Sequence, residues 1–246
     1  MSKFLYVIAG IVTFLAFILV MAPASLLVAA VEDQLKAVPD LKVGHISGRV
    51  WSGSAQIQYQ QFPTTVTWDL SALSLLVGRL SADVELREQG LDASFHLSVS
   101  GNEGTIRDAK AVVDARYINR ISVGYGLDLS GQFNLSEANV SFANQWITTA
   151  VGNLDWPGGI VHIETPQQLY SVDLPPLNGD LFMHEDNLRL AVQGSGERML
   201  DLTLKRTGWV AAAVSYAFMD LAGLPLPGSV SASPEEPAVL LEEKIL

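Results

Sequence analysis

The sequence predicts an all-β fold, an antiparallel meander or curved sheet that is barrel-like or sandwich-like, with one N-terminal transmembrane helix and a short C-terminal helix. Three features indicate this fold. Apolar and polar residues alternate through most of residues 43–205, which is typical of strands with one buried face. Residues 4–31 form an apolar run without charge, and residues 209–223 are rich in alanine. The spacing of the alternating segments predicts roughly ten short strands or more.

The N-terminal apolar run has the length and the flanking charges of a membrane anchor. Residues 4–31 exceed the roughly 20 apolar residues that span a bilayer core. Lys3 precedes the run, and Glu32 and Asp33 follow it. Because basic residues stay on the cytoplasmic side, we expect a single pass with a cytoplasmic N-terminus, and a chain that otherwise lies outside the cytoplasm, which in a bacterium is the periplasm. A cleaved signal peptide ending near Ala22-Pro23-Ala24 is the alternative.

Composition divides the chain into four expected regions. These are a membrane anchor over residues 1–31, a linker over 32–41, a periplasmic β-rich domain over 42–224 and a disordered tail over 225–246. The tail is assigned as disordered because it contains four prolines and two acidic pairs, and such a composition buries little apolar surface.

The stretch ISGRVWSGSAQI, residues 46–57, predicts the first strand after the linker. Its alternation places Trp51, Ala55 and Ile57 on one apolar face. Gly48 and Gly53 flank the tryptophan. We interpret them as the small neighbours that a flat indole ring requires.

The later alternating segments predict hairpins. Alternation over residues 80–86 and 91–99 is interrupted at Glu88-Gln89-Gly90, and it resumes over 109–117 and 127–135. It slips by one residue at Ser136-Glu137, which predicts a bulge or a turn. Across Gly194-Ser195-Gly196 we expect a hairpin in which Leu188, Leu190 and Val192 pair with Leu200, Leu202 and Leu204.

Two segments do not have the pattern of strands. Residues 144–151 are expected to form a short helix. Residues 209–223, WVAAAVSYAFMDLAG, are apolar but too short to span a bilayer comfortably, and we expect a helix that caps or plugs the sheet. The alternative for this second segment is a helix that binds the membrane interface or a partner.

Charge and composition exclude several classes of function. The net charge is −11, so a nucleic-acid partner, which requires clustered Lys and Arg, is not expected. The chain has no cysteine, which excludes disulfides, thiolate catalysis and cysteine-ligated metals. The four histidines form no metal-binding pattern, and His184-Glu185-Asp186 is expected to be a solvated turn. The sequence SVGYG at residues 122–126 resembles the selectivity filter of potassium channels. That filter works only between membrane-spanning helices, whereas this segment lies in strand-like sequence, so we expect no such function. We therefore predict no catalytic, cofactor-binding or metal-binding residue and no enzymatic activity.

Two motifs after the apolar run carry a resemblance to a known family. The first, GRVWSG, contains Gly48, Val50, Trp51 and Gly53. The second, VTWDLSALSLLVGRLSADVEL, contains Trp68, Leu70, Leu75, Gly78 and Leu80. A later Leu-x-Gly-x-Phe element contributes Leu129, Gly131 and Phe133. In this order, and over most of residues 1–207, the chain resembles the type II secretion system protein N family.

The resemblance implies a role in secretion rather than catalysis. It implies a bitopic inner-membrane protein that supports export of folded proteins across the outer membrane, with other inner-membrane and periplasmic subunits as partners and the bilayer contacted through residues 4–31. The family implies no catalytic residue, so Gly48, Trp51, Gly53, Trp68, Gly78, Gly131 and Phe133 are expected to be structural. The alternative is an anchored module that binds or transfers lipid on an apolar sheet face, similar in outline to AsmA-like proteins. That face could equally be a filled core.

Overall fold

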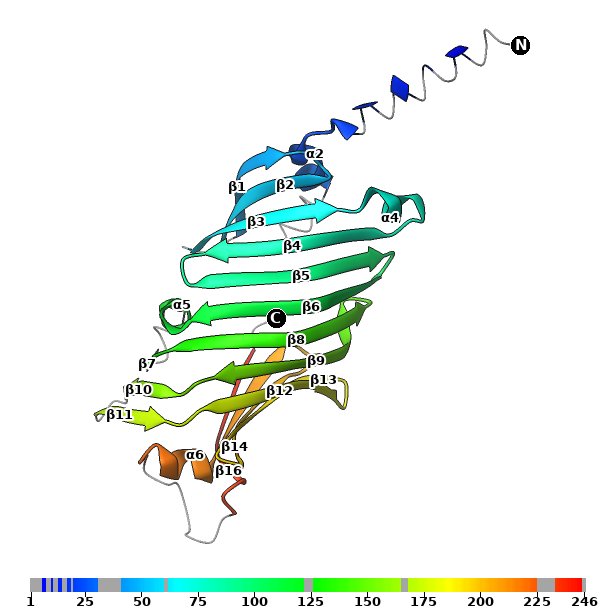
Figure 1. Cartoon of the computed structure of the whole chain (residues 1–246). Coiled ribbons are helices and arrows are strands. Elements are labelled where there is room, and N and C mark those ends of the chain that lie inside the picture. Colours follow the sequence, from blue (N-terminus) through cyan, green and yellow to red (C-terminus); the bar gives the residue numbers. More distant parts are fainter. Residues whose placement is uncertain are drawn as a thin grey trace. The chain divides into compact units, whose positions relative to one another are not determined.

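The computed structural model describes residues 6–7, 10, 13–14, 17–18, 20–30, 41–59, 62–121, 126–164, 168–224 and 233–244 (Figure 1). The chain forms two compact units, Met1–Glu88 and Gln89–Leu246. The boundary falls at the predicted turn, where one strand ends at Glu88 and the next begins at Leu91. The domain expected over residues 42–224 therefore contributes to both units.

Unit one is a four-stranded antiparallel sheet with two short helices at one end of its strands. The strands follow chain order, β1-β2-β3-β4, and each pairs with the next. Their bounds and those of the helices are α2 (Ala24–Ala30), β1 (Leu41–Gly48), β2 (Ser52–Tyr59), β3 (Phe62–Leu70), α4 (Ala72–Leu76) and β4 (Leu80–Glu88). Ala24, Ala55, Leu70 and Ala82 are buried in this unit.

Unit two contains a large antiparallel sheet and a three-stranded one. The large sheet has the order β5-β6-β8-β9-β12-β13-β14-β15-β16 within this unit, and the small sheet has the order β11-β10-β7. The large-sheet strands are β5 (Leu91–Ser100), β6 (Glu103–Asp114), β8 (Gln132–Ala143), β9 (Trp146–Trp156), β12 (Leu177–His184), β13 (Asn187–Gly194), β14 (Glu197–Leu204), β15 (Trp209–Ser215) and β16 (Pro237–Lys244). The small sheet comprises β7 (Leu127–Leu129), β10 (Gly159–Glu164) and β11 (Leu169–Leu174), and the helices are α5 (Ala115–Ile121) and α6 (Tyr216–Leu221).

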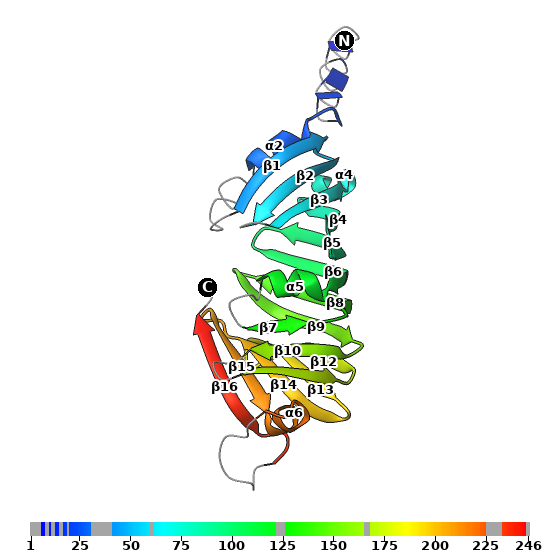
Figure 2. The same cartoon turned by 90° about the vertical axis from the view of Figure 1, so that its left-hand side faces the viewer.

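The packed core of unit two lies where the small sheet meets the large one (Figure 2). Trp156 of β9, Val161 of β10 and Leu174 of β11 are buried together. Half-buried apolar side chains from both sheets and from α6 surround them: Leu127, Leu129, Phe133, Ile163, Val172, Leu177 and Phe218. The core therefore lies at the ends of β8, β9 and β12 that adjoin the small sheet, and the large sheet is open rather than a closed barrel.

Several sequence predictions are confirmed. The described strands pair antiparallel throughout. The expected hairpin pairs Leu188 with Leu204, Leu190 with Leu202 and Val192 with Leu200. The slip at Ser136-Glu137 is a bulge, because the β8–β9 register shifts between Ser136 and Asn139 and Glu137 has φ 52°.

The predicted helix over residues 144–151 is wrong, because this segment begins strand β9. Asn144 and Gln145 have φ of 50° and 64°, and they form the two-residue turn that joins β8 to β9. Two successive positive φ values are the requirement of a tight hairpin turn. The residues after the turn then alternate as a strand, with Ala150 and Gly152 buried on one face.

The predicted helix over 209–223 is only half correct. Trp209–Ser215 forms β15, which pairs with β14 on one side and β16 on the other, and helix α6 begins at Tyr216. Pairing on both sides outweighs the helix propensity of the alanines, because tertiary context readily overrides such weak local preferences. Ser215 caps the helix by accepting a hydrogen bond from Phe218 N at 3.1 Å.

The prediction that the tail is disordered is also wrong for the last part of the tail. Pro237–Lys244 forms β16 and pairs with β15 from Pro237 to Lys244. Proline is tolerated as the first residue of a strand, and the following Ala-Val-Leu-Leu supplies the apolar residues. A further difference is α5, which occupies residues 115–121 where strand alternation to Tyr117 was expected.

The predictions for the membrane anchor, the linker and the glycine segment fall largely outside the described residues. Residues 31–40, 122–125 and 225–232 lie outside them, as do Met1–Leu5 and several positions of the apolar run. Within the part of the chain that the structure does describe, no helix has both the length and the apolar character needed to cross a bilayer.

Candidate functional site

Trp68 links the two motif segments of unit one through its contacts with Val50 and Gly53, which we call the Trp68 joint. Its indole Nε1, on β3, donates a hydrogen bond to the main-chain oxygen of Val50 at 3.0 Å. Its ring lies against Gly53 of β2, so closely that an added Cβ there would be 2.7 Å from Trp68 Cζ2. Gly48, which pairs with Gly53, has φ +89°, a conformation that favours glycine. Glycine is therefore required at both positions.

Trp51 has a different position from the one the alternation predicted. It lies in the turn between β1 and β2 and is half-buried, and its main-chain oxygen accepts a hydrogen bond from Leu70 N at 2.6 Å. The stretch at residues 46–57 is thus not the first strand, because it spans the end of β1, this turn and the start of β2. The indole that Gly53 accommodates belongs to Trp68, which comes from a distant part of the sequence.

A second tryptophan joint holds the Leu-x-Gly-x-Phe element of unit two. Trp156 Nε1 donates to the main-chain oxygen of Ser130 at 2.8 Å. Its ring stacks on Phe133 with 5.7 Å between centroids and 9° between planes. Gly131 has φ +85°, and a Cβ there would lie 3.1 Å from Trp156 Nε1. Gly131 and Phe133 therefore position the side chain at the centre of the unit's core.

Gly78 is the motif residue that meets no neighbour. It lies in the turn after α4 with φ +70°, and nothing comes within 4 Å of the place where its Cβ would be. Its main-chain nitrogen donates to Leu75 O at 3.0 Å, which closes the turn. Glycine is favoured here by backbone conformation alone.

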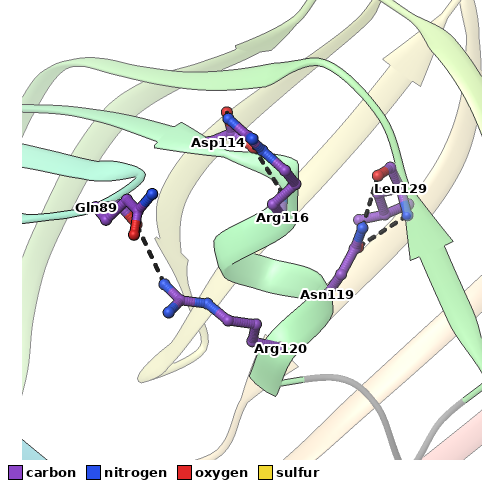
Figure 3. A network of polar contacts seen from close by, with 6 residues as sticks. All are labelled: Gln89, Asp114, Arg116, Asn119, Arg120 and Leu129. Atoms are coloured by element: carbon purple, nitrogen blue, oxygen red, sulfur yellow. Dashed lines mark hydrogen bonds and ion pairs between the residues drawn. The ribbon is translucent and has the colours of Figure 1, made fainter. Parts of the chain in front are cut away.

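Helix α5 carries a network of polar contacts (Figure 3). Arg116 donates to both carboxylate oxygens of Asp114, at 3.0 and 2.9 Å. These charge-assisted hydrogen bonds lower the pKa of Asp114 to about 2 and raise the pKa of Arg116. Asn119 bonds both the nitrogen and the oxygen of Leu129 in β7, at 2.8 and 2.7 Å. Arg120 reaches Gln89 O at 3.2 Å. The network fixes α5 between the turn before β5 and the small sheet.

The polar face of the large sheet carries a second charged pair. Arg189 of β13 bonds both carboxylate oxygens of Asp201 in β14, and this raises the pKa of Arg189. Arg198 approaches the same carboxylate at 3.8 Å. The pair lines an open hollow of about 230 Å³ beside β15 and β16.

The described residues show little that could support chemistry. The four histidines lie on four strands: His45 on β1, His96 on β5, His162 on β10 and His184 on β12. His184 and Glu185 are exposed at a turn, 3.9 Å apart, as predicted. Across the described ranges, no group of three or more His, Asp and Glu side chains could hold a metal ion. An open hollow of about 410 Å³ in unit one is lined by Ser, Thr, Gly and carboxylates beside Trp68.

The large sheet instead offers an apolar face and an edge. Paired residues share a face, so Leu181, Leu190, Leu202, Ala212 and Leu241 form one apolar row from β12 to β16. None of these side chains is buried. Among the described strands, β16 pairs with β15 alone (Figure 2). Its Leu240 and Leu241 are each 62% exposed and, as successive residues of a strand, lie on opposite faces. The row therefore ends at an exposed apolar edge, which is a surface suited to binding rather than to catalysis.

Comparison with known proteins gives two matches. A family model described as "Type II secretion system (T2SS), protein N" matches residues 39–238. A protein of Aeromonas hydrophila described as "Type II secretion system protein N" is 32% identical over 165 residues, which are 64% of this chain and 63% of that protein. The aligned part is thus less than two thirds of the relative's length. No solved structure matches the chain.

Proposed function

The chain belongs to the type II secretion system protein N family, and from this premise we propose that it is a non-catalytic subunit of a type II secretion system that supports export of folded proteins. The observation that carries the proposal is the family match over residues 39–238, which includes most of both units. In the proposed arrangement, the apolar run of residues 4–31 anchors the chain in the inner membrane through its part before Ala22, because Ala22 and Pro23 bond the β1–β2 turn and Ala24 is buried in unit one. The β-rich units lie in the periplasm. The uncharged run and its flanking Lys3, Glu32 and Asp33 support this orientation.

The proposed contact with other subunits is the β16 edge of the large sheet. An exposed edge strand presents main-chain donors and acceptors to which an extended segment of a partner can add as a further strand. Leu240 and Leu241 supply apolar contacts on both faces of that edge.

Secretion assays test the proposal directly. In a strain that depends on this system, deletion of the gene should lower release of exoproteins and leave them in the periplasm. Normal release from the deletion strain would refute the proposed function. Complementation then tests the edge: Leu240→Lys and Leu241→Lys should restore release poorly, because inserted lysines block strand addition.

The matched control for the edge is Leu169→Lys. Leu169 lies on β11 of the small sheet and is 65% exposed, so it presents the same chemical change at a comparably exposed leucine. This variant should restore release fully. Equal restoration by all three variants, with equal amounts of protein in the cell, would exclude β16 as the contact.

A lipid-binding module is the second candidate, and the half-covered apolar row from β12 to β16 favours it. A filled core would bury these leucines, whereas here an acyl chain could cover them. The full chain, purified in a detergent whose mass differs from that of any phospholipid, should then retain phospholipid that mass spectrometry detects. Leu202→Asp should release it, because a carboxylate in the row opposes acyl chains. Absence of lipid from the unmutated protein would refute this candidate.

A further inference from the structure

Helix α4 and the turn that follows it form an exposed apolar tip on unit one. Leu73 and Val77 are 77% and 78% exposed, and Leu75 is 41% exposed. The tip is ordered by its own hydrogen bonds, from Val77 N to Ser74 O at 3.2 Å and from Gly78 N to Leu75 O at 3.0 Å. Three large apolar side chains directed away from the fold within five positions form a patch that needs a covering surface.

The tip lies at the same end of the unit-one strands as α2, the last part of the N-terminal apolar run (Figure 1). Strand β3 ends there at Leu70 and β4 begins there at Leu80, and the turn between β1 and β2 lies at that same end. The N-terminal segment is attached to this turn, because Val50 N donates to Ala22 O at 2.9 Å and Pro23 bridges to Arg49. Strand pairing therefore fixes the spacing between α4 and the point where the run reaches the sheet.

The connection that carries the tip is free of acidic residues. The chain carries −11, yet residues 70–82 contain no Asp or Glu and residues 4–31 contain no charge at all. The connections themselves carry Arg49 and Arg79, both exposed, while the exposed Asp69 and Asp83 lie next to them on β3 and β4. Arginine at the base of an apolar tip can reach lipid phosphates while the leucines enter the acyl region. The exposed apolar tip with Arg79 at its base therefore fits a bilayer surface.

We propose that α4 and its turn are a second membrane contact, in which Leu73, Leu75 and Val77 enter the interfacial layer of the bilayer that holds the part of the apolar run before Ala22. The inference rests on the proposed anchoring. A single membrane span leaves the attached domain free to tilt and rotate. A second contact at the same end of the strands would hold unit one in one orientation on the membrane.

The absence of cysteine makes a depth measurement straightforward, because every introduced thiol is unique. The full chain carrying Val77→Cys is labelled with an environment-sensitive fluorophore and reconstituted into vesicles of zwitterionic and anionic phospholipid. Some of the lipids carry a nitroxide near the headgroup end of the acyl chain. We expect a blue-shifted emission and strong quenching. Gln56→Cys, exposed in the middle of β2, is the matched control and should remain unquenched.

Two further variants separate the outcomes. Phe17→Cys, within the apolar run, reports on the anchor itself. Quenching at Phe17→Cys without quenching at Val77→Cys would overturn the α4 contact and leave the anchor intact, as expected if α4 instead binds a protein. Loss of quenching at both positions would overturn the anchoring as well. Adding Leu73→Asp to Val77→Cys should abolish the quenching, because a carboxylate does not enter the interface. Quenching that persists in this double variant would contradict the proposed insertion.

Discussion

Substitution of Gly53 by alanine is the sharpest test of the Trp68 joint. The added Cβ would lie 2.7 Å from Trp68 Cζ2, 2.8 Å from Ser47 O and 2.9 Å from Arg49 O. The ring can move aside only by weakening the bond from its Nε1 to Val50 O, and such a bond contributes about 0.5–1.5 kcal/mol. The two carbonyl oxygens belong to the backbone at the end of β1 and in the β1–β2 turn, and overpacking of this kind costs about 1–3 kcal/mol. We therefore expect a loss of about 2–4 kcal/mol in the stability of unit one.

Hydrogen exchange measured by mass spectrometry over a range of urea concentrations gives this loss locally. Peptides that cover β2 and β3 report the opening free energy of unit one separately from unit two. Gly78→Ala is the control, since it has no steric contact and should lose only about 1–2 kcal/mol through its left-handed backbone. Gly53→Ala combined with Trp68→Phe should retain part of the penalty, because the carbonyl contacts remain. A loss below about 0.5 kcal/mol for Gly53→Ala would refute the reasoning.

Three further predictions concern unit two. Trp156→Ala should destabilise it by about 3–5 kcal/mol in urea unfolding followed by circular dichroism, because the ring is 4% exposed and its loss leaves a cavity; a change below about 1 kcal/mol would show that the core does not depend on it. Asp114 should titrate near pH 2 by carboxyl NMR rather than at 3.8. Because this pKa is lowered in the folded state, the pair stabilises the protein above about pH 3.8 and the contribution is lost as the pH falls toward 2; Arg116→Gln should return the pKa toward 3.8, and an unchanged pKa would exclude the pair as the cause. Arg189→Ala should lower the free energy of unfolding by about 1.5–3 kcal/mol, because it leaves the carboxylate of Asp201 without its main partner. Arg87→Ala, which removes an exposed ion pair, should change the free energy of unfolding little.

The strands that the sequence predicted well share one property. In the hairpin of β13 and β14, large leucines occupy one face and polar residues the other, so the period of two is visible in the letters. The bulge at Glu137 was equally visible, because a one-residue slip exchanges the faces. In β15 the alternation was hidden, since alanines lie on both faces, and in β16 the prolines and acidic residues nearby outweighed a short apolar segment.

The sequence identified the motif residues, but it did not predict which residues they contact. Gly48 and Gly53 were predicted to accommodate an indole, and an indole does lie against Gly53. It belongs to Trp68, which pairing of β2 with β3 places opposite Gly53. Phe133 was assigned to a motif without its stacking partner Trp156, because the two residues lie on separate strands. The exposed leucines of α4 and Val77 after it carried no signal in the sequence, since apolar residues between two strands predict burial as readily as exposure.

The sequence by itself determined that this chain is an antiparallel β protein of the secretion family with an uncharged N-terminal run, because alternation and charge are local properties of the chain. Only the tertiary structure decided which tryptophan meets which glycine, which strand forms the exposed edge, and that α4 lies at the same end of the unit-one strands as the attachment of the N-terminal segment. Those features depend on strand register, which brings together residues as far apart as Ser130 and Trp156. Register is set by pairing between strands, and no single segment contains that information.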